Sequence, residues 1–263
     1  MREITFDNLR RFNAIMGGLH FVQGVIMLFL ATSIIQTIAE FSPTITQLYL
    51  TFNPQTQSLE VVSRDLFDLP FGVLVAVFLL LSAGAHALIA IPKKLNDKYK
   101  TDLQNGINQF RWFEYALSSS VMITLIATLF GIYDIASLIL IFIVNASMNL
   151  FGLVMEQLNS GISKDNVNWG PFIWGCIAGI APWIAILIYM FGTGNLDMVP
   201  WFVWAIVGTY FVAFNSFPVN MILQYRRVGN WADYLYGERL YIILSLVAKS
   251  ALAWLVLFGA MQP

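Results

Sequence analysis

Apolar residues along this chain gather in seven long runs, and polar segments separate each run from the next. A helix needs roughly 20 apolar residues to cross about 30 Å of hydrocarbon, and each run is long enough. The pattern therefore predicts seven membrane-spanning helices, over residues 13–38, 69–91, 107–130, 135–158, 171–191, 200–224 and 240–261. We expect an all-α membrane protein, with a single seven-helix transmembrane domain over residues 1–263.

Composition supports this interpretation. Hydrophobic residues make up 58% of the chain and charged residues 11%, which excludes a lone soluble domain. Cys176 is the single cysteine and lies inside the fifth run, so one chain can form neither a disulfide nor a cysteine-type metal site. We expect its thiol to pack in the core.

Basic residues are distributed unevenly between the two ends of the predicted helices. Lys and Arg in short loops mark the cytoplasmic side of a membrane protein. We therefore predict a multi-pass protein of the plasma membrane with a cytoplasmic N-terminus and an extracellular C-terminus. The opposite side has only Arg64, whereas the predicted cytoplasmic side has Arg2, Arg10, Arg11, Lys93, Lys94, Lys98, Lys100, Lys164, Arg226, Arg227 and Arg239.

The first extracellular loop, residues 39–68, is longer than the other connections. Two β-prone stretches, residues 46–52 and 59–62, flank the turn signal Asn53-Pro54-Gln55. The pattern predicts a short β-hairpin. It serves either as a lid or partner surface, or as a cap packed on the bundle.

Ionisable residues within the runs are few, and Lys249 is the most unusual. It lies in the middle of the last run, with no Asp or Glu within nine residues on either side. A lysine at the centre of a membrane span costs ~2.5 to 3.5 kcal/mol on insertion scales, so it indicates a function. The other ionisable residues assigned to the runs are His20, His86, Arg111, Glu114 and Glu156.

Glu114 is the expected partner of Lys249, because it is the one carboxylate of these runs that is away from a helix end. A plain ion pair is possible, with Arg111 competing for the same carboxylate. Alternatively, a desolvated lysine readily forms a Schiff base with an aldehyde, and Glu114 then supplies the counterion. His20 and His86 are expected at a similar depth, on the cytoplasmic side of Lys249.

Four segments resemble microbial rhodopsins. The third run contains Arg111-Trp-Phe-Glu114-Tyr115-Ala-Leu-Ser118-Ser119, which is similar to the helix that faces the retinal Schiff base in that family. The sixth run contains Phe214-Asn-Ser-Phe217-Pro218-Val-Asn-Met221, which resembles the aromatic clamp on retinal. Met148 and Gly152 repeat the spacing of the fourth helix, and Lys249 takes the position of the retinal lysine.

Several departures narrow the resemblance. Ser245 stands where ion pumps usually carry a second carboxylate, and Leu125 stands where a proton pump has a carboxylic donor. Phe214 replaces the usual tryptophan of the clamp. Together with the inverted orientation, the long first loop, the lone Glu114 and the two histidines, these features resemble a heliorhodopsin.

The resemblance implies that all-trans retinal is bound to Lys249, with Glu114 as counterion. A polar cavity of His20, His86, Ser82, Ser119, Arg111 and water is expected to hold the released proton. Two histidines and Glu114 lack the fourth protein ligand that a structural zinc site generally needs, so we expect no metal. The other residues expected near the cofactor are Tyr115, Ser118, Ser119, Met122, Met148, Gly152, Phe214, Phe217, Pro218, Met221 and Ser245.

In function, the resemblance implies a photosensory retinal protein with a slow photocycle that is neither an ion pump nor an enzyme. It implies membrane lipid around the bundle, a homodimer and an unidentified cytoplasmic signalling partner, with no nucleic acid. A light-driven or light-gated proton transporter remains the alternative. A seven-helix enzyme or carrier without retinal is the third possibility.

Overall fold

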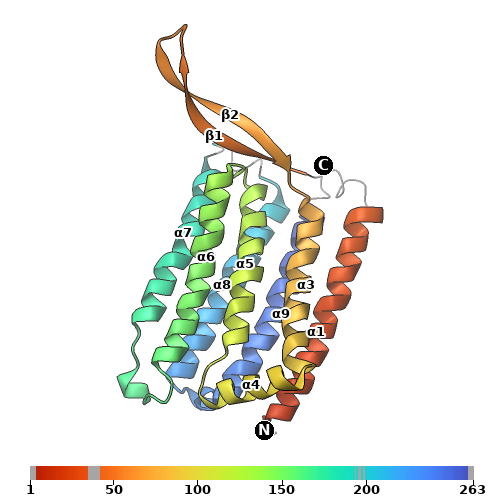
Figure 1. The fold of residues 1–263 in the computed structure, drawn as a ribbon, viewed down its shortest axis with the longest axis vertical. Helices are drawn as coiled ribbons and strands as arrows, with labels where there is room; N and C mark the ends of the chain where they lie inside the picture. The colour runs from red at the N-terminus through yellow and green to blue at the C-terminus, as the bar shows by residue number, and fades with distance from the viewer. Residues whose placement is uncertain (1–3, 35–41, 193, 195–196, 198, 260–263) are drawn as a thin grey trace.

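The computed structural model describes residues 4–34, 42–192, 194, 197 and 199–259. Within these residues, seven helices are long and apolar enough to cross a membrane, which confirms the predicted fold class. They stand side by side as one bundle (Figure 1). The helices are α1 (Phe6–Phe29), α3 (Phe71–Ala90), α5 (Gln109–Leu129), α6 (Ile135–Leu158), α7 (Gly170–Phe191), α8 (Trp201–Tyr225) and α9 (Tyr234–Gly259).

Helix ends differ modestly from the predicted spans. A π-helical segment, Leu30–Ile34, continues α1, and α9 begins at Tyr234, six residues before the predicted start. The predicted ends at Ile38 and Met261, and positions 39–41 of the predicted loop, lie outside the described residues. Capping side chains fix some helix starts: Asn108 accepts a hydrogen bond from the amide of Arg111 at the start of α5.

The two ends of the bundle differ in chemistry. We call the end where α1 begins the N-terminal face, and the end that bears the hairpin the hairpin face (Figure 1). In the half nearer the hairpin face, a continuous apolar core fills the bundle. It includes Met27, Val75, Leu79, Ile123, Leu125, Ile126, Ile186, Ile206, Leu252 and Val256.

One helix was not predicted: residues 93–104, interpreted as a basic loop, form α4 (Lys93–Gln104). It lies across the N-terminal face of the bundle (Figure 1). The buried side of α4 consists of Asn96, Tyr99 and Leu103, which are three or four residues apart. This spacing is typical of one face of a helix and is visible in the sequence. Two further 3₁₀ turns, Lys164–Asn166 and Gly229–Ala232, lie in other connections on this face.

The predicted hairpin is present and longer than expected. Strands β1 (Thr44–Asn53) and β2 (Ser58–Asp68) pair antiparallel from Thr44 opposite Asp68 to Asn53 opposite Ser58, with an irregularity between Ile45 and Thr46. The amide of Thr46 donates to the carbonyl of Tyr133 at 3.0 Å, which joins the base of the hairpin to the bundle.

Beyond this base, the hairpin projects away from the helices (Figure 1). Ile45 is fully buried at the base, whereas Leu50 and Val61 are 62% and 68% exposed. The alternative of a cap packed on the bundle is therefore wrong for most of the hairpin in the single chain.

Candidate functional site

Lys249 and Glu114 meet inside the bundle, as predicted from their isolation in apolar runs. Nζ of Lys249 on α9 lies 2.5 Å from Oε1 of Glu114 on α5, and it also donates to Oγ of Ser82 on α3 at 2.7 Å. Ser82 itself donates to Glu114 at 2.6 Å. Both charged side chains are at most 10% exposed, so the ion pair is shielded from water.

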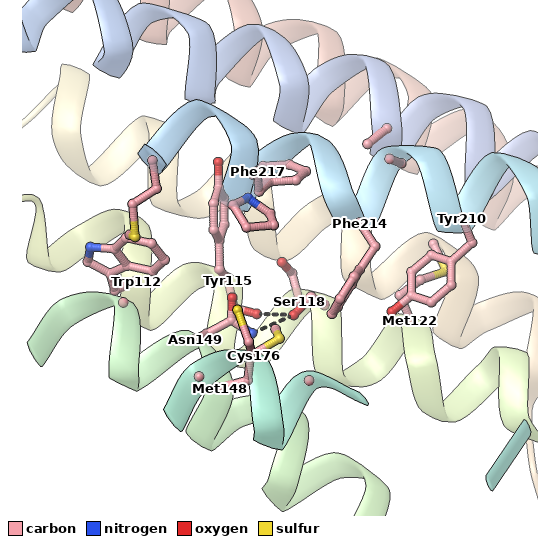
Figure 2. Close-up of a pocket in the computed structure, with 18 of the residues that line it drawn as sticks. Trp112, Tyr115, Ser118, Met122, Met148, Asn149, Cys176, Tyr210, Phe214 and Phe217 are labelled. Atoms are coloured by element: carbon pink, nitrogen blue, oxygen red, sulfur yellow. Dashed lines mark hydrogen bonds between the residues drawn. The ribbon is translucent and has the colours of Figure 1, made fainter. Parts of the chain in front are cut away.

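A cavity of about 160 Å³ is lined by Lys249 and by side chains of α5, α6, α7 and α8 (Figure 2). Its lining contains ten of the predicted cofactor contacts: Tyr115, Ser118, Ser119, Met122, Met148, Gly152, Phe214, Phe217, Pro218 and Met221. A largely apolar cavity with one buried amine fits a long apolar aldehyde, because it buries the aldehyde's carbon chain and positions the aldehyde end at Nζ.

Close helix packing keeps the cavity narrow. A Cβ added to Gly152 would overlap the Trp112 ring, and one added to Gly179 would lie 2.7 Å from Sδ of Met148. Trp112 and Tyr115 pack edge to face with ring centroids 6.1 Å apart, and Tyr115 packs the same way on Phe217. These contacts hold the rings of Trp112, Tyr115 and Phe217 in the cavity lining.

Some cavity residues were not predicted. Trp112, Asn149 and Tyr210 line the cavity. Trp183 is not part of the lining, but its ring stacks on Tyr210 with centroids 4.9 Å apart. Cys176 also lines the cavity and is exposed, so the prediction that its thiol packs in the core is wrong.

Sequence comparison agrees with this geometry. The family model described as Heliorhodopsin matches residues 9–261, nearly the whole chain. The chain belongs to the heliorhodopsin family. It is thus a microbial rhodopsin: a multi-pass, seven-helix membrane protein that binds retinal and senses light. Heliorhodopsins are not a known class of enzymes. No curated protein matches the chain.

The histidines of this heliorhodopsin lie together on the N-terminal side of Lys249. The rings of His20 and His86 stack with centroids 5.7 Å apart, and both residues are buried. Nδ1 of His86 lies 2.7 Å from Oδ1 of Asn13. Neither ring nitrogen of His20 has a hydrogen-bond partner within the described residues.

A second, smaller cavity of about 30 Å³ connects His86 with the ion pair. It is lined by Glu114, His86 and Ser245, and also by Asn13 and Arg111. Its size allows roughly two water molecules. Ser119, which was predicted in this polar group, instead accepts hydrogen bonds from Asn145 and Asn149 on α6.

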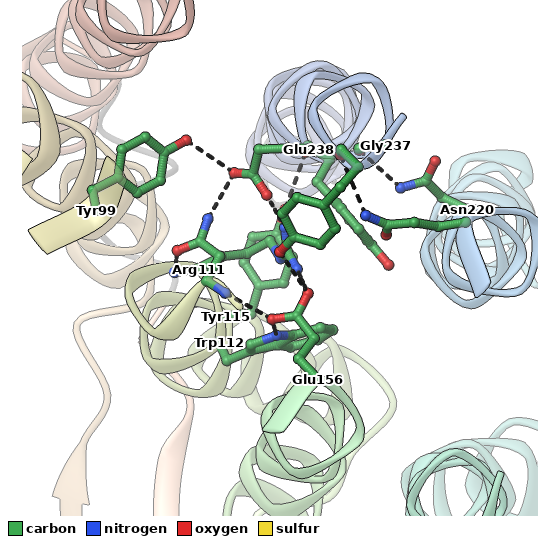
Figure 3. A network of polar contacts seen from close by, with 12 residues as sticks. Tyr99, Arg111, Trp112, Tyr115, Glu156, Asn220, Gly237 and Glu238 are labelled. Atoms are coloured by element: carbon green, nitrogen blue, oxygen red, sulfur yellow. Dashed lines mark hydrogen bonds and ion pairs between the residues drawn. The ribbon is translucent and has the colours of Figure 1, made fainter. Parts of the chain in front are cut away.

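Arg111 does not compete for Glu114. Its guanidinium is buried between Glu156 and Glu238, and it forms an ion pair with each (Figure 3). Glu238 was missed because the predicted last run begins at residue 240. It precedes Lys249 by eleven residues, which is about three helical turns, so helical spacing places both on one face of α9.

Potential metal ligands do not cluster in this heliorhodopsin. In residues 4–34 and 42–259, apart from the few positions left undescribed, no group of three or more His, Cys, Asp or Glu side chains is arranged to hold a metal ion.

Proposed function

We propose that this heliorhodopsin holds all-trans retinal on Nζ of Lys249, with Glu114 as the counterion, and acts as a slow photosensor. The observation that carries the proposal is the buried Lys249–Glu114 ion pair, whose lysine lines the apolar cavity. When bound, retinal supplies light-driven rotation about one double bond. The proposal also includes the roles predicted from the sequence for the other residues around the cofactor and for the proton network.

In the dark, Glu114 and Ser82 hold the proton on Nζ of Lys249. The carboxylate stabilises the positive charge, and the Ser82 hydroxyl lies 2.7 Å from Nζ. Because both charges are shielded from water, increasing their separation by a few ångströms costs free energy. Movement of Nζ away from Glu114 therefore lowers the affinity of Nζ for its proton.

Released protons have polar surroundings on one side only. His86 and the small cavity lie towards the N-terminal face, whereas Leu125, Ile123 and Val256 fill the other half and are each at most 1% exposed. A proton that leaves Nζ towards His86 therefore returns by the same route. This favours a long-lived altered state and a signalling role over pumping.

The proposal includes a cytoplasmic N-terminal face, an extracellular hairpin face and one transmembrane domain over residues 1–263. It also includes a cytoplasmic signalling partner and a homodimer. Exposed apolar side chains on the hairpin, among them Leu50, Phe52 and Val61, support a second protein surface there.

Purified protein, mixed with all-trans retinal, tests the binding site. We expect a visible absorption band in the wild type and none in Lys249→Ala, with Lys94→Ala on the exposed side of α4 as the matched control. Borohydride trapping followed by peptide mass spectrometry should find the chromophore on Lys249. A band that persists in Lys249→Ala refutes the site.

Light-induced pH changes in cell suspensions separate the sensor from the transporter. A sensor gives no sustained change, with or without an uncoupler. A sustained change that an uncoupler abolishes identifies active pumping, and a change that follows an imposed proton gradient identifies a light-gated channel.

A further inference from the structure

A chain of hydrogen bonds runs from His86 to the N-terminal face of the bundle. Nδ1 of His86 lies 2.7 Å from Oδ1 of Asn13, and Nδ2 of Asn13 lies 3.4 Å from the hydroxyl of Tyr99. That hydroxyl donates to Oε1 of Glu238 at 3.1 Å. We call His86, Asn13, Tyr99 and Glu238 the His86–Glu238 chain. It links α3, α1, α4 and α9.

The direction of each donation follows from Asn13. Its Nδ2 also donates to the backbone carbonyl of Leu9 at 2.9 Å, and a carbonyl can only accept. The amide oxygen must therefore face His86, so Nδ1 of His86 carries a proton and donates it. Burial, together with the negative charge of Glu238, raises the pKa of Tyr99 well above its usual range, so its hydroxyl remains a donor.

The chain ends in a cluster with surplus negative charge. Two carboxylates, Glu156 and Glu238, share the single guanidinium of Arg111 (Figure 3), and all three side chains are at most 4% exposed. Each carboxylate also accepts uncharged donors. Asn108 and Tyr99 donate to Glu238, and the side chains of Trp112 and Tyr234 donate to Glu156. These donors satisfy the carboxylate oxygens of both side chains.

Charged and titratable groups surround His86 on several elements. His20 on α1 stacks on it, and Glu114 and Arg111 on α5 line the same small cavity. Lys249 on α9 forms the ion pair with Glu114, and Glu238 also lines the cavity. Among these groups, Glu238 is the carboxylate that the hydrogen-bond chain joins to Nδ1 of His86.

We propose that the His86–Glu238 chain stabilises a proton received on Nε2 of His86 and transmits the resulting charge to helix α4. This inference rests on the proposed function. The proton leaves Nζ of Lys249 and forms an N–H bond at Nε2, while Nδ1 keeps its own proton. Glu114 remains ionised, and no other bond changes.

Helix α4 responds because Tyr99 belongs to it. A positive imidazolium strengthens the donation to Asn13, and each later donation along the chain is strengthened in turn. The Asn13–Tyr99 contact is the longest of the three at 3.4 Å, so it has the most room to shorten. Tyr99 and α4 are drawn towards the bundle, and Lys93, Lys94 and Lys98 on its exposed side move with it.

Tyr99→Phe tests the chain with little change in packing, because it removes one hydroxyl. Tyr234→Phe is the matched control: its hydroxyl donates to Glu156 in the same cluster but lies outside the chain. Flash photolysis should show that the deprotonated state decays roughly three- to tenfold faster in Tyr99→Phe than in the wild type, as expected for loss of one hydrogen bond. Asn13→Leu, which breaks the chain at another link, should give the same result.

Amide hydrogen exchange of residues 93–104 provides a second readout. In retinal-free protein, this exchange can be measured without light, with acid as the source of the proton. After correction for the intrinsic pH dependence of amide exchange, acidification should increase the protection of α4 in the wild type and in Tyr234→Phe, and should have a smaller effect in Tyr99→Phe. Illumination of the retinal-bound wild type should also increase this protection.

Unchanged decay in both Tyr99→Phe and Asn13→Leu, or equal decay in Tyr99→Phe and Tyr234→Phe, overturns the inference. So does an acid response of α4 that Tyr99→Phe leaves intact. Failure of the proposed function has a different signature, because the wild type would then form no visible band.

Discussion

Glu114 neutralises a cation that water barely reaches. In the described part of the chain, it is the carboxylate that contacts Nζ of Lys249, and Ser82 adds an uncharged contact. Removing one partner of a buried ion pair costs about 3 to 5 kcal/mol, because the other charge remains uncompensated. In the retinal-bound protein, Glu114→Gln should therefore cause Nζ of Lys249 to lose its proton at neutral pH.

Absorption spectroscopy measures this loss as a shift from the visible to the near ultraviolet. Ser82→Ala should shift the band only slightly, because it leaves the carboxylate in place. If Glu114→Gln kept the visible band at neutral pH, the counterion would lie elsewhere.

Gly152 has no room for a side chain. Its nearest neighbour, Trp112, is held in place because its indole N–H donates to Glu156 at 2.6 Å. Gly152→Ala must displace this ring into the cavity or break that hydrogen bond, at a cost of about 1 to 3 kcal/mol. We expect a lower melting temperature and weaker retinal uptake. Gly84→Ala is the control, because open space surrounds Gly84; similar losses in both variants would contradict the steric explanation.

Individual site residues were predictable where they broke a pattern. Lys249 and Glu114 are charges within apolar runs, so their positions alone indicated a pair. Trp112 and Tyr210 could not be recognised in the same way, because a membrane helix is apolar on all faces and its cavity side resembles its lipid side. Glu238 could have been found from its spacing to Lys249, but it lies two residues before the predicted start of the last run.

At the scale of elements, hydropathy predicted the spanning helices and missed α4. The spanning helices follow from length and apolarity alone, which the bilayer imposes. Helix α4 is polar overall, and its burial depends on three residues, Asn96, Tyr99 and Leu103, that contact the ends of other helices. The length of the hairpin was also unpredictable, because β2 continues through polar residues such as Arg64 and Asp65.

Asp134 connects the hairpin to the bundle. Its carboxylate accepts hydrogen bonds from the amide of Ser137 at the start of α6 and from the amide of Leu48 in β1. Asp134→Ala should lower the free energy of unfolding by about 1 kcal/mol through loss of the helix cap. Amide exchange should also increase near Leu48. Glu60→Gln, which changes a carboxylate near the turn of the hairpin, should not loosen the base.

The contribution of Asp134 depends on pH. Although burial opposes ionisation, hydrogen bonds from Ser137 and Leu48 hold the pKa of Asp134 below its usual range. A lowered carboxyl pKa stabilises the fold above the usual aspartate pKa, and this stabilisation is lost as the pH falls through the lowered value. Relative to the intrinsic exchange rate at each pH, the hairpin amides should therefore lose protection in the wild type below about pH 4 and respond less in Asp134→Ala.

The interior of the bundle is polar towards the N-terminal face and apolar towards the hairpin face, so the orientation of the protein decides where a proton and a signal can go. The described basic residues outside the apolar interior lie in α1, in α4, in the α6–α7 and α8–α9 connections and at the start of α9, whereas Arg64 lies in the hairpin. Because retained Lys and Arg mark the cytoplasm, the buried histidines and the Arg111 cluster should open towards the cell interior.

Single-cysteine variants test this orientation in a Cys176→Ser background. A membrane-impermeant maleimide should label Gln55→Cys, in the hairpin turn, on intact cells. It should label Asp97→Cys, on the exposed side of α4, only after the membrane is broken. The opposite pattern would place His86 and α4 towards the outside, and a cytoplasmic partner could then no longer read the state of the site through α4.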